Sequence, residues 1–333
     1  MSRAILPGLE APDAVLEAEV RGRLGDVEAA LTRAVQHEPG LLADSAEYLL
    51  NAGGKRFRPM LVLLSGYYGD PTDPRLIPGS VAVELVHLAT LYHDDVIDEA
   101  DARRGTPSAN ARWDNTVAIL TGDFLFARAS EIIADVGTDP TRLLSRAIAT
   151  VCDGQIREVS VAGQVEQTVD HYLGTIRRKT SALLAASCHL GAMLSDAPRE
   201  YHGILEEIGD EIGAAFQLSD DIMDLTVSAD VLGKEPGVDL KEGVYTLPVL
   251  HALSDGESAG ELRGLLAAGP PQGAAFERAL EIVRTNGSID HARSAVSTSV
   301  ARAVELVGLL PPGPASEALV QLSEFLARRC GAS

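Results

Sequence analysis

Residues 91–99 read Leu91-Tyr92-His93-Asp94-Asp95-Val96-Ile97-Asp98-Glu99 and place three aspartates at DDxxD spacing. On a helix, Asp94 and Asp98 form an (i, i+4) pair on one face, and Asp95 lies one step round. Carboxylates this close repel one another, so the pattern costs helix stability unless a cation neutralises it. Mg²⁺ suits such a site because it takes one or two carboxylates and accepts phosphate oxygens for the rest of its shell.

The residues before this motif favour a metal site over a solvated acidic face, which is the simpler interpretation of a lone DDxxD. Apolar side chains recur at helical spacing up to the aspartates: Val81, Leu85, Leu88 and Leu91. We therefore expect a helix that is buried on one side and ends in an acidic cluster. Residues 71–79 are expected to form a loop, with Ser80 as the N-cap of the helix. His87 shares the face of Asp94, where a structural and a functional role are equally open.

A second DDxxD, Asp220-Asp221-Ile222-Met223-Asp224, lies near the end of another helix-like segment, residues 204–225. One face of this segment is apolar, and Gln217, Asp220 and Asp224 follow one another on the other face. Two such motifs in similar contexts are difficult to explain as two solvated faces. We expect them to face each other across a helical bundle and to chelate several Mg²⁺ ions around one diphosphate.

Basic segments accompany both motifs. The segment 55–58 (Lys-Arg-Phe-Arg) follows Gly53-Gly54, a pair that allows a sharp turn and a close approach to a ligand, so its three cations could face a diphosphate. Arg103 and Arg104 lie in a turn just after the first motif, and their planar guanidinium groups suit diphosphate oxygens. The cationic run 177–180 opposes the helix macrodipole, which suggests a bound anion. The turn at residues 53–58 and the turn that carries Arg103 and Arg104 could each instead be a charged surface turn.

The composition indicates an all-α protein. Of 333 residues, 46% are hydrophobic and 4% aromatic, in segments rich in Ala, Leu, Glu and Arg. The formal charge of −20 argues against nucleic-acid binding. Cys152, Cys188 and Cys330 are far apart, which favours a reducing cytosol over disulfides or zinc. No apolar run approaches the roughly 20 residues that span a bilayer, so we expect a soluble, cytoplasmic protein.

Proline, glycine and helical periodicity divide the rest of the chain. We expect helices over residues 14–35, 41–51, 115–136, 140–161 and 171–194, with further helices after residue 246. Residues 1–13 are expected to be flexible. Gln155 and Glu158 are interpreted as ordinary polar positions. Residues 232–240 are expected to form a loop that closes over phosphates.

Five blocks, in order, resemble the polyprenyl synthetase family of trans-isoprenyl diphosphate synthases, from about Ala43 to the last helix. They are residues 53–59, 93–105, 179–180, 216–224 and 233–234. The resemblance implies the isoprenoid synthase fold: a single domain over residues 1–333, with roughly ten or more helices around a deep central cavity. It also implies a homodimer.

The implied reaction joins an allylic diphosphate head-to-tail to isopentenyl diphosphate, repeatedly, making E double bonds. The resemblance assigns about three Mg²⁺ ions to Asp94, Asp98 and Asp220, supported by Asp95, Asp221 and Asp224. It assigns the allylic diphosphate to Arg103, Lys179 and Lys234, and the developing cation to Thr180 and Gln217. It assigns isopentenyl diphosphate to Lys55, Arg58, His87 and Arg104.

Ala89 lies five residues before Asp94, where short-chain members of the family often carry an aromatic residue. Its small side chain implies a long product, roughly C30 to C50, growing along a helix that rises about 1.5 Å per residue. Phe124 or Phe126 would then form the tunnel floor. Val244 departs from a lysine common in the family, and Lys241 could replace that contact.

Three alternatives stay open beside a long-chain synthase. A short-chain farnesyl or geranylgeranyl diphosphate synthase would share every motif. A class I terpene cyclase would typically lack the second DDxxD and the basic turn. A regulatory subunit of a heteromeric synthase would be expected to lose aspartates or that turn. Transient contact with a membrane for product release is also left open.

Overall fold

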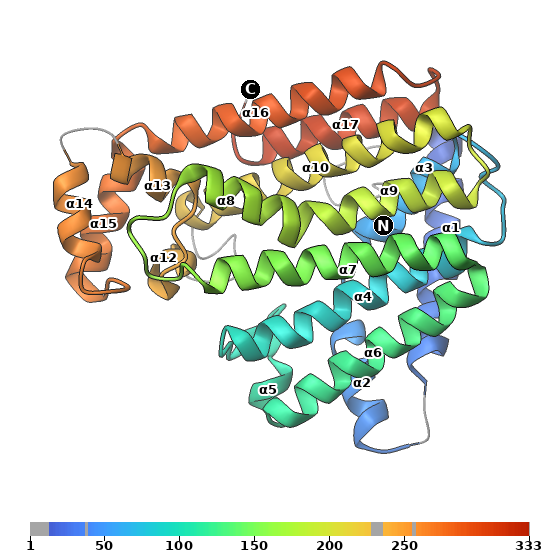
Figure 1. Ribbon diagram of the computed structural model, residues 1–333, viewed down its shortest axis with the longest axis horizontal. Helices are drawn as coiled ribbons and strands as arrows, with labels where there is room; N and C mark the ends of the chain where they lie inside the picture. Colours follow the sequence, from blue (N-terminus) through green and yellow to red (C-terminus); the bar gives the residue numbers. More distant parts are fainter. Residues whose placement is uncertain (1–12, 37–38, 228–235, 255–257, 333) are drawn as a thin grey trace. The chain divides into compact units, whose positions relative to one another are not determined.

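The computed structural model describes residues 13–36, 39–227, 236–254 and 258–332 (Figure 1). These ranges form more than ten helices and one short β-hairpin, so the all-α prediction is confirmed. The predicted flexible segment lies outside the described residues, apart from Asp13. Two compact units are present, residues 1–148, 183–209 and 308–319 in the first, and residues 149–182, 210–307 and 320–333 in the second. The single domain over the whole chain stays a prediction.

The first unit is built on the helix that carries the first aspartate motif. Its elements are α1 (Ala14–Val35), α2 (Leu41–Asn51), α3 (Phe57–Gly66), α4 (Leu76–Ile97), β1 (Ala102–Arg103), β2 (Thr106–Pro107), α5 (Ala109–Arg112), α6 (Asn115–Val136) and parts of α7 (Thr138–Val159), α9 (Ala182–Leu194), α10 (Arg199–Thr226) and α17 (Pro314–Arg329). Helix α4 packs against α1, α3 and α6, and α6 lies along it in Figure 1. Leu85, Leu88 and Tyr92 are completely buried there, which confirms the predicted apolar face.

Helix α4 begins earlier than the sequence pattern indicated. The expected loop 71–79 and the N-cap at Ser80 are wrong, because α4 starts at Leu76 and Ser80 is buried inside it. Pro78 falls in the first turn, where a backbone N–H has no partner within the helix. Proline is therefore tolerated at this position and does not mark a loop.

The second unit carries the second aspartate motif on the last turns of α10. Its other elements are α8 (Val169–Ile176), the π-helical turn η1 (Arg177–Ser181), α12 (Val238–Glu242), α13 (Leu247–Ser254), α14 (Ala259–Leu266), α15 (Gly273–Thr285), α16 (Ser288–Val307) and the later parts of α7 and α17. The apolar helix α13 packs against α8, α14, α15 and α16. It therefore forms the centre of this unit's core.

The predicted helix over residues 171–194 is interrupted at its cationic run. Residues 177–181 form the π turn η1 between α8 and α9. Two glycines allow neighbouring helices to approach this turn closely. A Cβ added at Gly154 of α7 would lie 2.4 Å from the backbone N of Lys179, and one at Gly213 of α10 would lie 2.5 Å from Ser181 Cα. Single-turn π segments are rare and often occur at functional sites.

Local signals explain the helices whose bounds agree with the sequence. The predictions for 14–35, 41–51 and 115–136 match α1, α2 and α6. Asp13 caps α1 by accepting from Val15 N at 2.7 Å, and Asp114 caps α6 by accepting from Val117 N at 2.8 Å.

All three cysteines are free. Cys152 is exposed, whereas Cys188 and Cys330 are buried. None of the described helices has the length and apolar character needed to cross a bilayer.

Candidate active site

The first aspartate motif ends α4, with its middle residue buried and the other two closer to solvent. Asp98 is the exposed C-cap, and Asp94 is half-buried one turn before it. Asp95 is completely buried and accepts from Arg103 Nε at 2.7 Å, while its Oδ2 has no hydrogen-bond partner among the described residues. Burial raises the pKa of Asp95, and the charge of Arg103 opposes that shift. The protein itself therefore already uses one oxygen of Asp95.

The two arginines after this motif are placed by the β1–β2 hairpin. Arg104 and Gly105 occupy the turn with φ values of +53° and +77°, as two-residue hairpin turns require. Arg103 reaches back to Asp95. Arg104 donates instead to the carbonyl of Leu49 at 3.3 Å and to that of Gly53. The hairpin thus connects the aspartate motif with the glycine-rich turn.

Only part of the basic segment 55–58 is available to a ligand. Arg56, in a left-handed conformation with φ +48°, is 6% exposed. Its guanidinium group donates to Glu28 at 2.5 Å, to Glu84 at 3.1 Å and to the carbonyl of Leu50 at 3.3 Å. The expectation that all three cations face a diphosphate is therefore wrong for Arg56, which holds the turn together. Lys55 is exposed.

Arg58, His87 and Arg104 form an electrostatic cluster, and its two arginines also interact with Glu84, which is 2% exposed. Burial lowers the pKa of Arg58 to about 10, and the charges of Glu84 and Asp94 oppose that shift. Burial and the neighbouring arginines hold the pKa of His87 well below its usual range, so the imidazole is neutral at pH 7. The first unit thus brings three of the four predicted isopentenyl diphosphate ligands together, within electrostatic reach of Asp94.

In the second motif, the middle aspartate is again buried and bound by protein groups. Asp221 accepts from the hydroxyl of Tyr172 and from Gln217 Nε2 at 2.8 Å. Burial raises the pKa of Asp221 to about 7. Thr180 in turn donates to Gln217 Oε1 at 2.8 Å. The predicted pair Thr180 and Gln217 is therefore connected to the aspartate motif by a continuous hydrogen-bonded chain.

The remaining cations of the π turn have protein partners. Lys179 pairs with Glu158 at 2.6 Å, so Glu158 is not an ordinary polar position. Arg177 pairs with Asp210 and Glu211, and Arg178 with Asp153. These acidic residues offset the two arginine charges without any bound anion. Gln155, on the same helix as Glu158, has both amide atoms buried without a partner among the described residues, which a simple polar position does not explain.

Sequence reasoning missed Glu84, Tyr172 and Arg329. Glu84 and Tyr172 are polar residues within helices whose partners lie far along the chain, so no local spacing marks them. Arg329, at the end of α17, donates to Asp220 across 109 positions. Lys234 and residues 232–235 of the expected loop 232–240 lie outside the described residues. The loop prediction is wrong for its last residues, because α12 already begins at Val238. Lys241 places its ammonium group 4.7 Å from the centre of the Phe276 ring.

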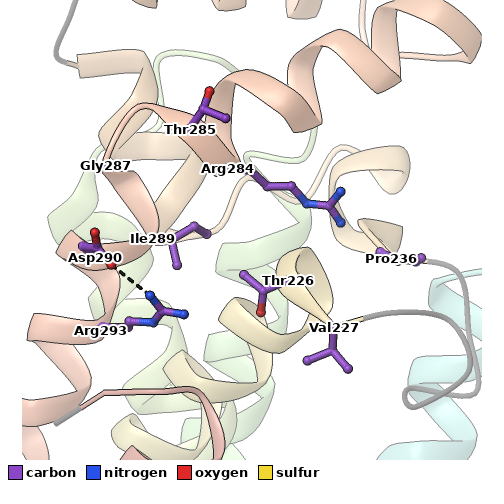
Figure 2. A pocket seen from close by; sticks show the side chains of 9 residues that line it. All are labelled: Thr226, Val227, Pro236, Arg284, Thr285, Gly287, Ile289, Asp290 and Arg293. Atoms are coloured by element: carbon purple, nitrogen blue, oxygen red, sulfur yellow. Dashed lines mark hydrogen bonds and ion pairs between the residues drawn. The ribbon is translucent and has the colours of Figure 1, made fainter.

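A cavity of about 760 Å³ in the second unit is separate from these residues (Figure 2). Its lining contains none of the site residues predicted from the sequence. Arg284 donates to the carbonyl of Leu225 at 2.6 Å, and Arg293 pairs with Asp290 at 2.9 Å. Both guanidinium groups in its wall are thus held by protein oxygens.

The aspartates fit hard divalent cations that a substrate helps to bind. Among the described residues, no three His, Cys, Asp or Glu side chains form a ready-made metal cage. Mg²⁺ does not require one, because it keeps waters and takes phosphate oxygens beside one or two carboxylates. Asp94 and Asp98 in the first unit, and Asp220 in the second, offer such carboxylates. That the two motifs face each other stays a prediction.

Comparisons with known proteins agree with this chemistry. The profile of the family described as "Polyprenyl synthetase" matches residues 39–283. A nonaprenyl diphosphate synthase of Mycobacterium tuberculosis is 39% identical over 98% of both chains. Component 2 of the heptaprenyl diphosphate synthase of Geobacillus stearothermophilus is 40% identical over 92% of this chain and 95% of its own.

A solved structure shows the same fold. The geranylgeranyl pyrophosphate synthase of Corynebacterium glutamicum, complexed with calcium and isoprenyl diphosphate, superimposes with a TM-score of 0.86 at 38% identity. The match covers 96% of this chain and 99% of that one. The chain therefore belongs to the polyprenyl synthetase family and is a prenyltransferase that makes polyprenyl diphosphates.

Proposed function

We propose that this prenyltransferase condenses an allylic diphosphate repeatedly with isopentenyl diphosphate, with about three Mg²⁺ ions bound, to give a long (E)-polyprenyl diphosphate. The observation that carries the proposal is the cluster of Arg58, His87 and Arg104 in the same unit as Asp94. A diphosphate that keeps its C–O bond needs only cations and hydrogen-bonding groups, and Arg58 and Arg104 supply the cations. A diphosphate that leaves needs metal ions to neutralise its charge, and the adjacent aspartates are suitable ligands for such ions.

Each group has one task in this proposal. Mg²⁺, when bound, neutralises the charge that develops on the leaving diphosphate. Asp94, Asp98 and Asp220 hold the ions, while Asp95, Asp221 and Asp224 support them. Arg103, Lys179 and Lys234 bind the allylic diphosphate, and Thr180 and Gln217 direct oxygen dipoles at the allylic cation. Lys55, Arg58, His87 and Arg104 hold isopentenyl diphosphate.

The burial of Tyr172, Asp221 and Thr180 supports the proposed handling of the cation. The hydrogen-bonded chain from Thr180 through Gln217 to Asp221 fixes the orientation of the Gln217 amide. A preoriented dipole needs no reorganisation as positive charge forms on carbon. The double bond of isopentenyl diphosphate then attacks that carbon, and the proton lost afterwards can pass to the departed diphosphate.

The proposed product is roughly C30 to C50, grown along α4. The nonaprenyl and heptaprenyl relatives support this length. Ala89, completely buried in α4, supports it because its methyl group is smaller than the aromatic ring that short-chain members of the family often carry. A short product is the second candidate, favoured by the likeness to the geranylgeranyl pyrophosphate synthase.

We also infer a homodimer that works in the cytoplasm. Ile119 and Leu120 on α6 are exposed apolar side chains. Association of two copies of the chain would cover this apolar surface. The experiment supplies the purified chain alone with farnesyl diphosphate, labelled isopentenyl diphosphate and Mg²⁺, and then sizes the products. Products of C30 or longer support the proposal. A stop at C20 favours the short-chain candidate, and no turnover without a second protein favours a heteromeric synthase.

A further inference from the structure

Arg329 connects α17 to the second aspartate motif. Its Nε donates to Ser219 Oγ at 2.8 Å, and its Nη2 donates to the carbonyl of Phe216 at 3.0 Å and to Asp220 Oδ1. Its Cζ lies 4.7 Å from the centre of the Phe216 ring. The side chain is 12% exposed, against 43% for Asp220. Three acceptors and a ring face therefore fix this positive charge beside the aspartate.

The chain next to Arg329 is anchored as well. Arg293 of α16 donates to the carbonyl of Cys330 at 3.0 Å, and the same guanidinium group pairs with Asp290 (Figure 2). Cys330 and Ala332 are buried. The backbone contacts thus hold Arg329 near Asp220, while its own hydrogen bonds orient the guanidinium group.

A guanidinium group at this oxygen has two electrostatic consequences. In the metal-free protein it offsets the repulsion among the carboxylates that α10 collects within about one turn. When a divalent cation binds to Asp220, the same charge repels it and competes for the same lone pairs. Both effects act in one direction, because both stabilise the metal-free state relative to the metal-bound state.

We propose that Arg329 is an internal counter-ion of the second aspartate motif, which holds Asp220 in the metal-free protein and lowers the affinity of that motif for Mg²⁺. This inference rests on the proposed function, in which Asp220 is a Mg²⁺ ligand. Arg329 is a positioning residue, because it acts on the cation through Asp220. The motif then takes up Mg²⁺ readily only together with a diphosphate, whose negative charge outweighs that of the arginine.

The test is calorimetric titration of the full chain with Mg²⁺, first without and then with inorganic diphosphate. Arg329→Gln removes the charge and keeps hydrogen-bonding atoms, and its Mg²⁺ affinity is expected to rise roughly three- to tenfold. Arg329→Lys keeps the charge and is expected to stay close to the wild type. Arg328→Gln is the matched control, because Arg328 lies one residue away, is exposed and pairs with Glu324 at 3.2 Å.

Thermal melting gives a second readout. Added Mg²⁺ is expected to raise the Tm of Arg329→Gln more than that of the wild type, because the ion replaces the lost counter-charge. Ser219→Ala keeps every charge and loosens Arg329, so its Mg²⁺ affinity is expected to rise by a smaller factor, about twofold. This variant decides the question if Arg329→Gln does not fold.

The outcomes separate the two proposals. Unchanged or weaker Mg²⁺ binding by Arg329→Gln, with normal binding by the wild type, overturns the counter-ion role and leaves the proposed function intact. Should Arg329→Gln fail to fold, unchanged affinity in Ser219→Ala overturns the role instead. An absence of Mg²⁺ binding in both the wild type and Arg329→Gln, with inorganic diphosphate present, contradicts the proposed function itself.

Discussion

Arg103 donates to Oδ1 of Asp95 from Nε at 2.7 Å and from Nη2 at 2.6 Å. Asp221, at the same position of the second motif, is bound in a parallel way by Tyr172 and Gln217. The middle aspartate of each motif thus fastens the motif to neighbouring protein groups. The first aspartate of each is closer to solvent, which suits a metal ligand.

This difference predicts that substituting Asp94 lowers turnover, whereas substituting the adjacent Asp95 lowers stability. Asp94→Asn should lower kcat by about a hundredfold or more, because a carboxylate that neutralises the leaving group is lost. Its Tm should not fall, since one of the repelling charges is removed. Asp95→Asn should lower the free energy of unfolding by about 1–3 kcal/mol, because it leaves the Arg103 charge uncompensated. Melting curves and turnover at saturating Mg²⁺ measure both. Near-normal turnover in Asp94→Asn would contradict the metal site.

The π turn depends on close approach by two glycines, which gives a second prediction. Gly154→Ala and Gly213→Ala each place a Cβ within 2.5 Å of the backbone of the turn. We expect both to displace Lys179 and Thr180 and to lower kcat at least tenfold, with a loss of stability of about 1–3 kcal/mol. Gly203→Ala is the control, because its Cβ would meet no atom within 4 Å. That substitution should stabilise α10 by about 0.5–1 kcal/mol.

Ala89 tests the product-length proposal. Ala89→Phe should shift the main product to about C15 or C20 if the side chain borders the growing tail, which advances along α4. In that case the ring enters open space and the Tm changes little. A ring forced into a filled core instead costs about 1–3 kcal/mol. A lower Tm with an unchanged product distribution would show that Ala89 is only a packing residue.

His87 predicts a pH dependence of stability. Its pKa in the folded protein lies well below the ordinary value of 6.5, because of burial first and then of the nearby arginines. Below about pH 6.5 the unfolded chain therefore binds more protons than the folded one. The stability that the neutral imidazole contributes is present above that pH and is lost as the pH falls towards the folded pKa.

The measurement compares melting of the wild type and His87→Gln between pH 7.5 and 5. The variant should lose less stability over this range, because its amide does not titrate. Equal losses in the two proteins would mean that His87 is not held neutral. Since four arginines act on the imidazole electrostatically, a change in KM for isopentenyl diphosphate is expected in the same variant.

The parts of the fold that local signals control were predictable from the sequence. Asp13 and Asp114 mark where α1 and α6 begin, because an N-cap side chain bonds within its own turn, and both starting residues agree with the sequence prediction. The start of α4 was not predicted, because Pro78 is tolerated in a first turn. The π turn could not be predicted, since the glycines that admit it, Gly154 and Gly213, lie more than 20 positions from it in the chain. Only its cationic run gave a signal.

In the candidate site, too, the residues with a local sequence signal could be predicted and those with distant partners could not. The aspartates and the basic turn repeat at short spacings, so they could be recognised along the chain. Glu84, Tyr172 and Arg329 could not, because each acts on a residue that only folding brings near. Arg56 was misassigned for the same reason: its distant partners Glu28 and Glu84 decide that it supports the turn.

Cys152 gives this protein a ready point of attachment for a spectroscopic probe. It is the exposed thiol, while Cys188 and Cys330 are buried. It precedes Gly154 by two residues, about 200° around α7, so a dye there points away from the π turn that Gly154 contacts. A maleimide fluorophore on the unmodified chain would therefore sit on the helix that supports Lys179 without blocking it. Changes in its emission would follow substrate binding in real time.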